Sequence, residues 1–353
     1  MIVLCKKIIC ILCVLTILFP LTVSAKNNNV SAQKAVVIDK STSTVLYQKS
    51  SNVKCSMAST TKIMTCLIAC EKLKQNDIVT ITNKMLDKTE GSLIYLKVGD
   101  KITVSDLIKG ALLASGNDAA NSLAVYTSGS ISEFVKLMNL YAIKFGMKNT
   151  HFETPSGLDS KNHYSTAYDM AVLTSHALDN ETFASVCKLQ KADITINGKI
   201  QTIYNHNKLL YQTENCIGVK TGFTEKSGRC LVSAYDFKGS TIIIVTLNDY
   251  DDWNDHKKLF DYAKNQYKTL SRTQNISIDC VGTNRKKVVC TAQFDVSYLD
   301  NLTFKYYYYP ILYAPILQNT KVGKTEIYSN NKLIRTVDII VPESVKVWQT
   351  TMK

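Results

Sequence analysis

The feature that most constrains this chain is an apolar run, Ile63 to Cys70, that begins directly after Ser59 and Lys62. Its hydrophobic residues cover nearly the whole circumference of a helix, which predicts a helix buried in the middle of a domain. A serine and a lysine three residues apart on that helix lie on one face. The same Ser-x-x-Lys spacing also occurs at Ser51, Ser185 and Ser329, so the spacing alone indicates little. The buried helix is what distinguishes Ser59.

Two further short motifs follow in order, and the first of them is Ser115-Gly116-Asn117. It lies between two helical patterns, so one interpretation is a turn that caps the helix beginning near Ala119. In the functional interpretation the Ser115 hydroxyl relays a proton and the Asn117 amide holds a peptide carbonyl. Gly116 would make the bend inexpensive.

The second motif, Lys220-Thr221-Gly222, lies inside a predicted strand from Ile217 to Phe223. It combines a cation, a hydroxyl and a glycine that lets another backbone approach the strand closely. A substrate could therefore lie alongside as an extra strand. The backbone N–H of Phe223 could then join that of Ser59 in an oxyanion hole.

These motifs can supply a nucleophile and its base. A serine hydroxyl needs a base to take its proton, and Lys62 is the candidate that the sequence places beside Ser59. A free lysine has a pKa of about 10.4, so burial or a second cation such as Lys220 must lower it. The alternative is that Lys62 only extends from the helix toward solvent.

The first 25 residues predict a secretory signal. Lys6 and Lys7 precede an apolar stretch from Ile8 to Val23, and a small-residue site ends at Ala25. An uncleaved membrane anchor is the alternative. Cleavage leaves roughly 325 residues, enough for two domains, and lowers the formal net charge from +13 to +11.

The hydrophobic periods predict an α+β fold, an antiparallel sheet flanked by helices with a helical insertion, over residues 26–270. A separate, small β-rich domain is predicted for residues 271–353. The expected strands of the first domain are 34–40, 43–49, 217–223, 230–235 and 241–247. One expected helix begins at Ser59. The other expected helices cover 104–113, 119–126, 131–145, 166–178 and 253–270. The aromatic run Tyr306 to Tyr309 predicts a strand with one buried face, with a ligand-binding platform as the alternative.

Composition narrows the partners and cofactors. Eight of the eleven cysteines follow residue 25, and Cys280 with Cys290 are the best candidates for a disulfide if one exists. The five histidines are scattered, so we expect no metal and no other cofactor. A basic exported protein indicates an anionic cell-envelope surface as partner, with a diffusely basic surface as the alternative, and nucleic acid is not expected.

Longer segments around these motifs resemble low-molecular-mass penicillin-binding proteins, which are serine-type D-alanyl-D-alanine carboxypeptidases of the β-lactamase/transpeptidase superfamily. The resemblance covers nearly the whole chain after residue 25. The segments that carry it are 58–64, 115–120, 149–158, 207–210, 220–224 and 228–234, with 314–316 and 322–328 resembling the family's β-rich domain.

The resemblance implies removal of the terminal D-Ala from peptidoglycan stem pentapeptides, with β-lactam antibiotics as covalent inhibitors. It implies a nucleophile at Ser59, a base at Lys62 and a relay at Ser115, and the implied substrate contacts are Asn117, Lys220, Thr221, Gly222 and Phe223. Many members end in an amphipathic membrane anchor, and no convincing helix of this kind follows residue 340.

Two other functions are alternatives to the carboxypeptidase. A serine β-lactamase shares the three motifs, but a class A enzyme needs a Glu-x-x-Leu-Asn loop that the sequence does not show. A catalytically silent wall-binding protein would not need all six polar residues of the three motifs. Carboxypeptidase activity is therefore the leading hypothesis.

Overall fold

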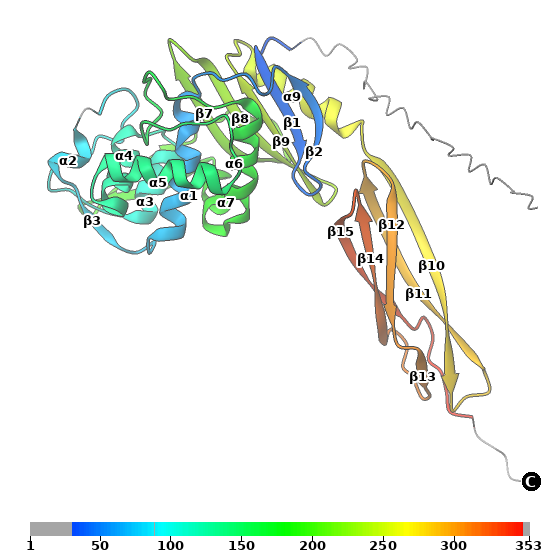
Figure 1. The fold of residues 1–353 in the computed structure, drawn as a ribbon. Helices are drawn as coiled ribbons and strands as arrows, with labels where there is room; N and C mark the ends of the chain where they lie inside the picture. Colours follow the sequence, from blue (N-terminus) through cyan, green and yellow to red (C-terminus); the bar gives the residue numbers. More distant parts are fainter. Residues whose placement is uncertain (1–29, 88, 349–353) are drawn as a thin grey trace, which may run out of the picture.

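The computed structural model describes residues 30–87 and 89–348, and Figure 1 shows them as two parts joined by a short connection. The first part combines a sheet with helices, and the second is an elongated β structure. The predicted signal segment lies outside the described residues. Within those residues, no helix has the length and apolar character needed to cross a membrane.

An antiparallel five-stranded sheet forms the centre of the first part, in the order β2-β1-β9-β8-β7. Its strands confirm the predicted hairpin and the three later strands. They are β1 (Lys34–Asp39), β2 (Thr44–Lys49), β7 (Cys216–Thr224), β8 (Gly228–Phe237) and β9 (Ser240–Leu247). Because β7 is an edge strand, one of its sides is open to an added strand.

Alternate residues of these strands face two different cores. Val232 and Val245 pack against the buried helix that follows Lys62, whereas Leu231 and Ile244 pack against the last helix of this part. The helices are α1 (Lys62–Lys72), α2 (Asn83–Leu86), α3 (Val104–Leu112), α4 (Asn117–Ser128), α5 (Ile131–Lys144), α6 (Ala167–Asp179), α7 (Glu181–Cys187), α8 (Leu209–Gln212) and α9 (Asp252–Lys264). Residues 62–69 of α1 are all buried, which confirms the predicted central helix.

Two small antiparallel sheets of two strands each were not predicted. They are formed by β3 (Ile78–Thr80) with β4 (Lys101–Thr103), and by β5 (Lys191–Ile196) with β6 (Lys199–Tyr204).

The end of α9 corrects one prediction. The helix was expected to reach Leu270, but it ends at Lys264, and β10 (Lys268–Val281) begins four residues later. Leu270 pairs with Val296 of β11 (Lys287–Tyr298) and packs beside the apolar cluster of Phe294 and Ile327. Packing against a neighbouring strand therefore overrides the helical spacing of this residue.

The second part is a six-stranded sheet in the order β12-β14-β15-β11-β10-β13. Its other strands are β11 (Lys287–Tyr298), β12 (Leu302–Tyr308), β13 (Ile311–Tyr313), β14 (Lys321–Ser329) and β15 (Lys332–Ile340). The predicted buried face of the Tyr306 to Tyr309 run is wrong, because all four side chains are exposed. The first three lie on the edge strand β12, which ends at Tyr308. The described cysteines are free thiols, including Cys280 and Cys290.

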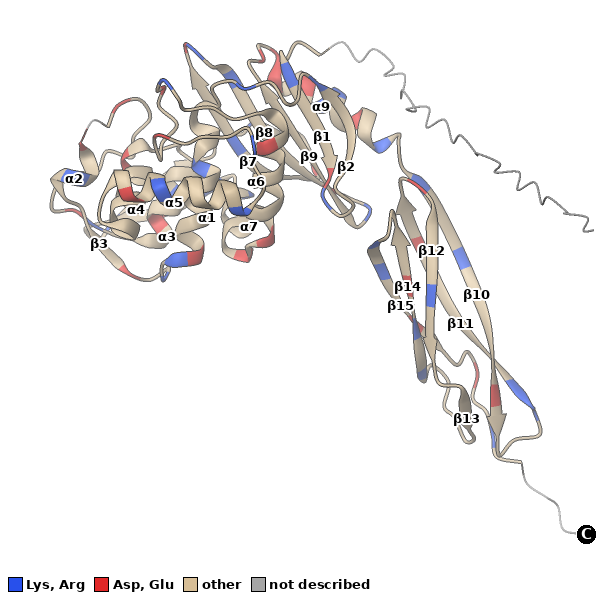
Figure 2. Cartoon of the chain, viewed as in Figure 1, with Lys and Arg blue, Asp and Glu red and all other residues tan. Residues whose placement is uncertain are grey.

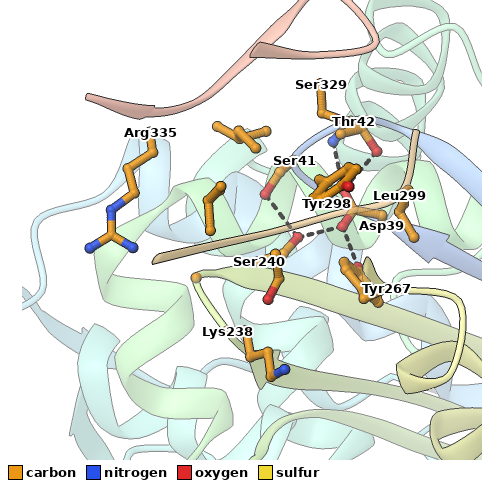
Figure 3. Close-up of a pocket in the computed structure, with 14 residues that line it drawn as sticks. Asp39, Ser41, Thr42, Lys238, Ser240, Tyr267, Tyr298, Leu299, Ser329 and Arg335 are labelled. Carbon is orange, nitrogen blue, oxygen red and sulfur yellow. Dashed lines mark hydrogen bonds between the residues drawn. The ribbon is translucent and has the colours of Figure 1, made fainter. Parts of the chain in front are cut away.

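The two parts meet through polar groups around a cavity of about 290 Å³, shown in Figure 3. On the sheet side, the Asp39 carboxylate accepts hydrogen bonds from Thr42 Oγ1 at 2.8 Å, Ser240 Oγ at 2.5 Å and the Tyr267 hydroxyl. Across the junction, Lys332 Nζ donates to Ser43 Oγ at 2.6 Å. The buried apolar residues form separate cores within each part.

Charged side chains are spread over both parts. Figure 2 shows lysine and arginine on the helices, on the central sheet and along the β structure, with acidic residues among them.

Candidate active site

Ser59 lies in a tight turn immediately before α1. Residues Ala58–Thr61 form a 3₁₀ helix, and Lys62 is the first residue of the α-helix, so Ser59 precedes the helix that it was expected to open. Its side chain is half-buried, while Lys62 is completely buried. The Lys62 Nζ atom lies 2.8 Å from Ser59 Oγ. The alternative in which Lys62 extends to solvent is wrong.

Lys62 contacts three oxygen atoms. They are Ser59 Oγ at 2.8 Å, Asn117 Oδ1 at 2.7 Å and the Ser156 carbonyl oxygen at 2.7 Å. A protonated amine donates to all three, whereas a neutral amine donates to two and presents its lone pair to the third. Of the three partners only the Ser59 hydroxyl carries a proton to give. The lone pair of a neutral Lys62 can therefore accept a proton from Ser59.

Two effects favour neutral Lys62. Burial lowers the pKa of its amine well below the usual range, and the nearby Lys220 cation lowers it further. Burial also lowers the pKa of Lys220 to about 7. The two effects on the pKa of Lys62 are those named from the sequence, burial and Lys220 as a second cation.

The loop before α4 places Ser115 opposite Lys220. The Lys220 Nζ atom donates to Ser115 Oγ at 3.1 Å. The unusual backbone is at Ser115, with a φ of 60°, whereas Gly116 has an ordinary φ of −57°, so the predicted reason for the glycine is wrong. A Cβ at Gly116 would instead lie 2.9 Å from Asp118 Oδ1 and 3.2 Å from Ile94.

Asp118 is a positioning residue that sequence reasoning missed. Its buried carboxylate accepts from the backbone N–H groups of Ile94 at 3.1 Å and Leu96 at 3.0 Å, which fixes the neighbouring loop. It also accepts from Ala119 N at 2.9 Å within the first turn of α4. The residue at the N-cap of this helix is Gly116, and no side-chain hydrogen bond caps it.

Asn117 has contacts on both atoms of its amide. Oδ1 accepts from Lys62, and Nδ2 donates to the Glu90 carbonyl oxygen. One N–H of the amide remains for another acceptor. The side chain thus contacts Lys62, and its contact with a substrate carbonyl stays a prediction.

Gly222 of β7 allows the turn that carries Ser59 to approach the sheet. A Cβ at this position would lie 2.9 Å from Ser59 N and 3.1 Å from both Ala58 Cβ and Thr60 N. The predicted close approach therefore exists, and the approaching backbone is that of the turn itself. Lys220, Thr221 and Gly222 all lie within β7, as expected.

A cavity of about 430 Å³ opens in front of Ser59. It is lined by Ser59, Ser92, Ser115, His206, Thr221, Gly222, Phe223, Arg229, Asp252 and Trp253. Lys62, Asn117 and Lys220 lie behind this surface, with exposed fractions of at most 4 %. Sequence reasoning gave no role to His206 or to Arg229, Asp252 and Trp253, because none of them belongs to the three short motifs.

The chain matches the family model for D-alanyl-D-alanine carboxypeptidases over residues 21–251. It also matches the C-terminal domain of penicillin-binding protein 5 over residues 267–347. The chain belongs to the D-alanyl-D-alanine carboxypeptidase family. The predicted resemblance is thus confirmed, and the protein is a serine carboxypeptidase of the penicillin-binding type.

Relatives with this architecture are found in several bacteria. The D-alanyl-D-alanine carboxypeptidase DacC of Escherichia coli is 31 % identical over 346 residues, which cover 90 % of this chain and 85 % of DacC. DacF of Bacillus subtilis is 35 % identical over 271 residues, 73 % of this chain and 69 % of DacF. The structure of penicillin-binding protein 5 from Haemophilus influenzae aligns with a TM-score of 0.63 at 26 % identity, covering 90 % of this chain and 98 % of that one. The predicted α+β fold with a β-rich C-terminal part is confirmed.

Proposed function

We propose that this carboxypeptidase removes the terminal D-Ala from peptidoglycan stem pentapeptides through an acyl-enzyme on Ser59. The observation that carries the proposal is the set of three contacts around Lys62, because it aims a buried amine with a lowered pKa at one hydroxyl. A lysine that served only packing would need no such arrangement.

In the acylation step, Lys62 takes the Ser59 proton and Oγ attacks the carbonyl carbon of the penultimate D-Ala. The oxyanion is stabilised by the backbone N–H groups of Ser59 and Phe223. The proton returns through Ser115 to the leaving amine nitrogen as the peptide bond breaks. Free D-Ala leaves, and water later hydrolyses the ester to restore Ser59.

The substrate lies along the open edge of β7, and Thr221 contacts its terminal carboxylate. The Thr221 side chain lines the cavity, whereas Lys220 is buried behind it. Lys220 then acts chiefly on protons, since it contacts Ser115 and lowers the pKa of Lys62.

The remaining parts of the proposal concern location. The first 25 residues support export to the cell envelope, where the pentapeptide substrate is found. The basic composition supports association with an anionic envelope surface. We assign the chain from residue 26 to Tyr267 to catalysis, and the β part that begins at Lys268 to placement of the catalytic part near wall polymer.

Covalent labelling with benzylpenicillin tests the assigned nucleophile. The purified protein should gain one penicilloyl group, and a peptide digest should place it on Ser59. Ser59→Ala should abolish the adduct, whereas Ser185→Ala, which alters an exposed serine with the same Ser-x-x-Lys spacing, should keep it. An adduct that survives in Ser59→Ala, or rapid penicillin hydrolysis without an adduct, would contradict the proposal.

A further inference from the structure

A terminal carboxylate of the substrate needs a cationic partner in the cavity. Lys220 was predicted for this role, but its Nζ atom donates to Ser115 Oγ at 3.1 Å and to the Thr221 carbonyl oxygen at 2.8 Å. The residue is 1 % exposed and does not line the cavity. Because burial brings the pKa of its amine to about 7, a large fraction is also uncharged at neutral pH.

Arg229 lies on the correct face of the sheet. In the antiparallel pair of β7 and β8, Thr221 is opposite Leu231 and Phe223 is opposite Arg229. Residues two apart on a strand, and residues opposite one another, share a face. The side chains of Thr221, Phe223 and Arg229 therefore point to one side, and all three line the cavity in front of Ser59.

Two residues at the start of α9 hold the guanidinium of Arg229 in place. Its Nη2 atom donates to Asp252 Oδ1 at 2.6 Å, and its Cζ atom lies 5.4 Å from the centre of the Trp253 ring. The Asp252 side chain is 4 % exposed and that of Arg229 is 40 % exposed, so the anchor is buried and the cation reaches the cavity. Arginine keeps its charge throughout the physiological pH range.

The guanidinium also has unused hydrogen-bonding capacity. A guanidinium carries five N–H donors, and the bond from Nη2 to Asp252 uses one of them. Because the Arg229 side chain is 40 % exposed at the cavity, donors of its outer end remain for a ligand. A carboxylate is the acceptor whose planar geometry matches a guanidinium.

We infer that Arg229, together with the Thr221 hydroxyl, binds the terminal carboxylate of the substrate, and that Asp252 and Trp253 position this arginine. The inference rests on the proposed function, since it assigns the substrate end that the cavity accepts. His206 is the other basic side chain on the cavity wall. Burial, Lys220 and Lys62 all lower its pKa, so its imidazole is neutral at pH 7 and offers no positive charge.

The test compares acylation of Ser59 by two ligands that differ in one carboxylate, benzylpenicillin and its methyl ester. Each opens its β-lactam ring, so that the acyl carbon bonds to Ser59 Oγ and the ring nitrogen takes up the proton. Arg229→Gln should slow acylation by benzylpenicillin on the order of 10- to 100-fold, the loss expected for a charge-assisted hydrogen bond. Acylation by the ester should change less than about threefold.

Further variants separate charge from geometry. Arg229→Lys keeps the charge and should recover part of the loss, and Asp252→Asn should weaken discrimination without abolishing it. Arg285→Gln is the matched control, because Arg285 forms an exposed ion pair with Glu343 far along the chain in the β part. It should leave both rates unchanged.

Equal losses with both ligands, or no loss in folded Arg229→Gln, would overturn the inference. A selective loss in His206→Gln with none in Arg229→Gln would assign the carboxylate to His206 instead. A different result would contradict the proposed function and not the inference: a wild-type protein that is acylated by penicillin but releases no D-Ala from a pentapeptide. The ratio of the two acylation rates would still measure the role of Arg229.

Discussion

Replacement of Gly222 by alanine is the sharpest test of how the nucleophile is placed. The new Cβ would lie 2.9 Å from Ser59 N and 3.1 Å from Thr60 N. These neighbours are backbone atoms of the turn, so no flexible side chain can move aside. An ordinary contact begins near 3.4 Å, and β7 and the turn must therefore separate by about 0.5 Å.

That displacement is large on the scale of catalysis. Donors of an oxyanion hole act at 2.7–3.1 Å, a window of about 0.4 Å, and the shift between Ser59 and Phe223 exceeds it. Loss of one donor typically costs ~10²–10³ in rate, or about 2.7–4 kcal/mol. We expect Gly222→Ala to lower the acylation rate by at least about 10²-fold.

The assay is stopped-flow acylation by penicillin together with thermal unfolding of each variant. Gly110→Ala is a suitable control, because its Cβ would meet the end of the Ile94 side chain at 2.8 Å and contact no atom of the Ser59 turn. A folded Gly222→Ala protein that is acylated at the wild-type rate would refute the reasoning.

Three other predictions concern protons and the division of the chain. Lys220→Met should raise the pKa of Lys62, so kcat/KM should fall most below about pH 7, where Lys220 is charged, and the deficit should shrink at higher pH. An unchanged pH profile would contradict this. A chain ending at Tyr267 should keep its activity on small peptides, since all proposed catalytic residues precede that point; inactivity of a protein still folded by circular dichroism would oppose the assignment. Burial lowers the pKa of His163 to about 4 and that of His256 to about 3, so the unfolded state binds protons first, and the free energy of unfolding should fall by a few kcal/mol as the pH drops from 6.5 to 4. A stability that stays constant over this range in denaturant titrations would disprove that origin.

Much of the catalytic centre could be predicted from the sequence, because each part is encoded locally. The apolar residues after Lys62 indicate a central helix, and the turn that carries Ser59 precedes it directly. Alternating residues around Lys220 indicate a strand of the main sheet. Only the relative placement of these segments needed the structure.

Features that depend on contacts distant in sequence could not be predicted. Arg229 meets Asp252 and Trp253 because β8 and α9 are neighbours in the fold, and no local pattern marks this encounter. Leu270 has helical spacing with the residues before it, yet the pairing of β10 with β11 decides its conformation. The exposed tyrosines of β12 show the same limit, because strand periodicity does not reveal which faces find a partner.

The most direct measurement is mass analysis of the products formed from a stem pentapeptide that ends in D-Ala-D-Ala. The account predicts release of one free D-Ala and a tetrapeptide, with no reaction in Ser59→Ala and normal reaction in Ser185→Ala. Its central claim is that Ser59, activated by Lys62, attacks the carbonyl of the penultimate residue. Cleavage at another bond, or D-Ala release that persists in Ser59→Ala, would contradict it.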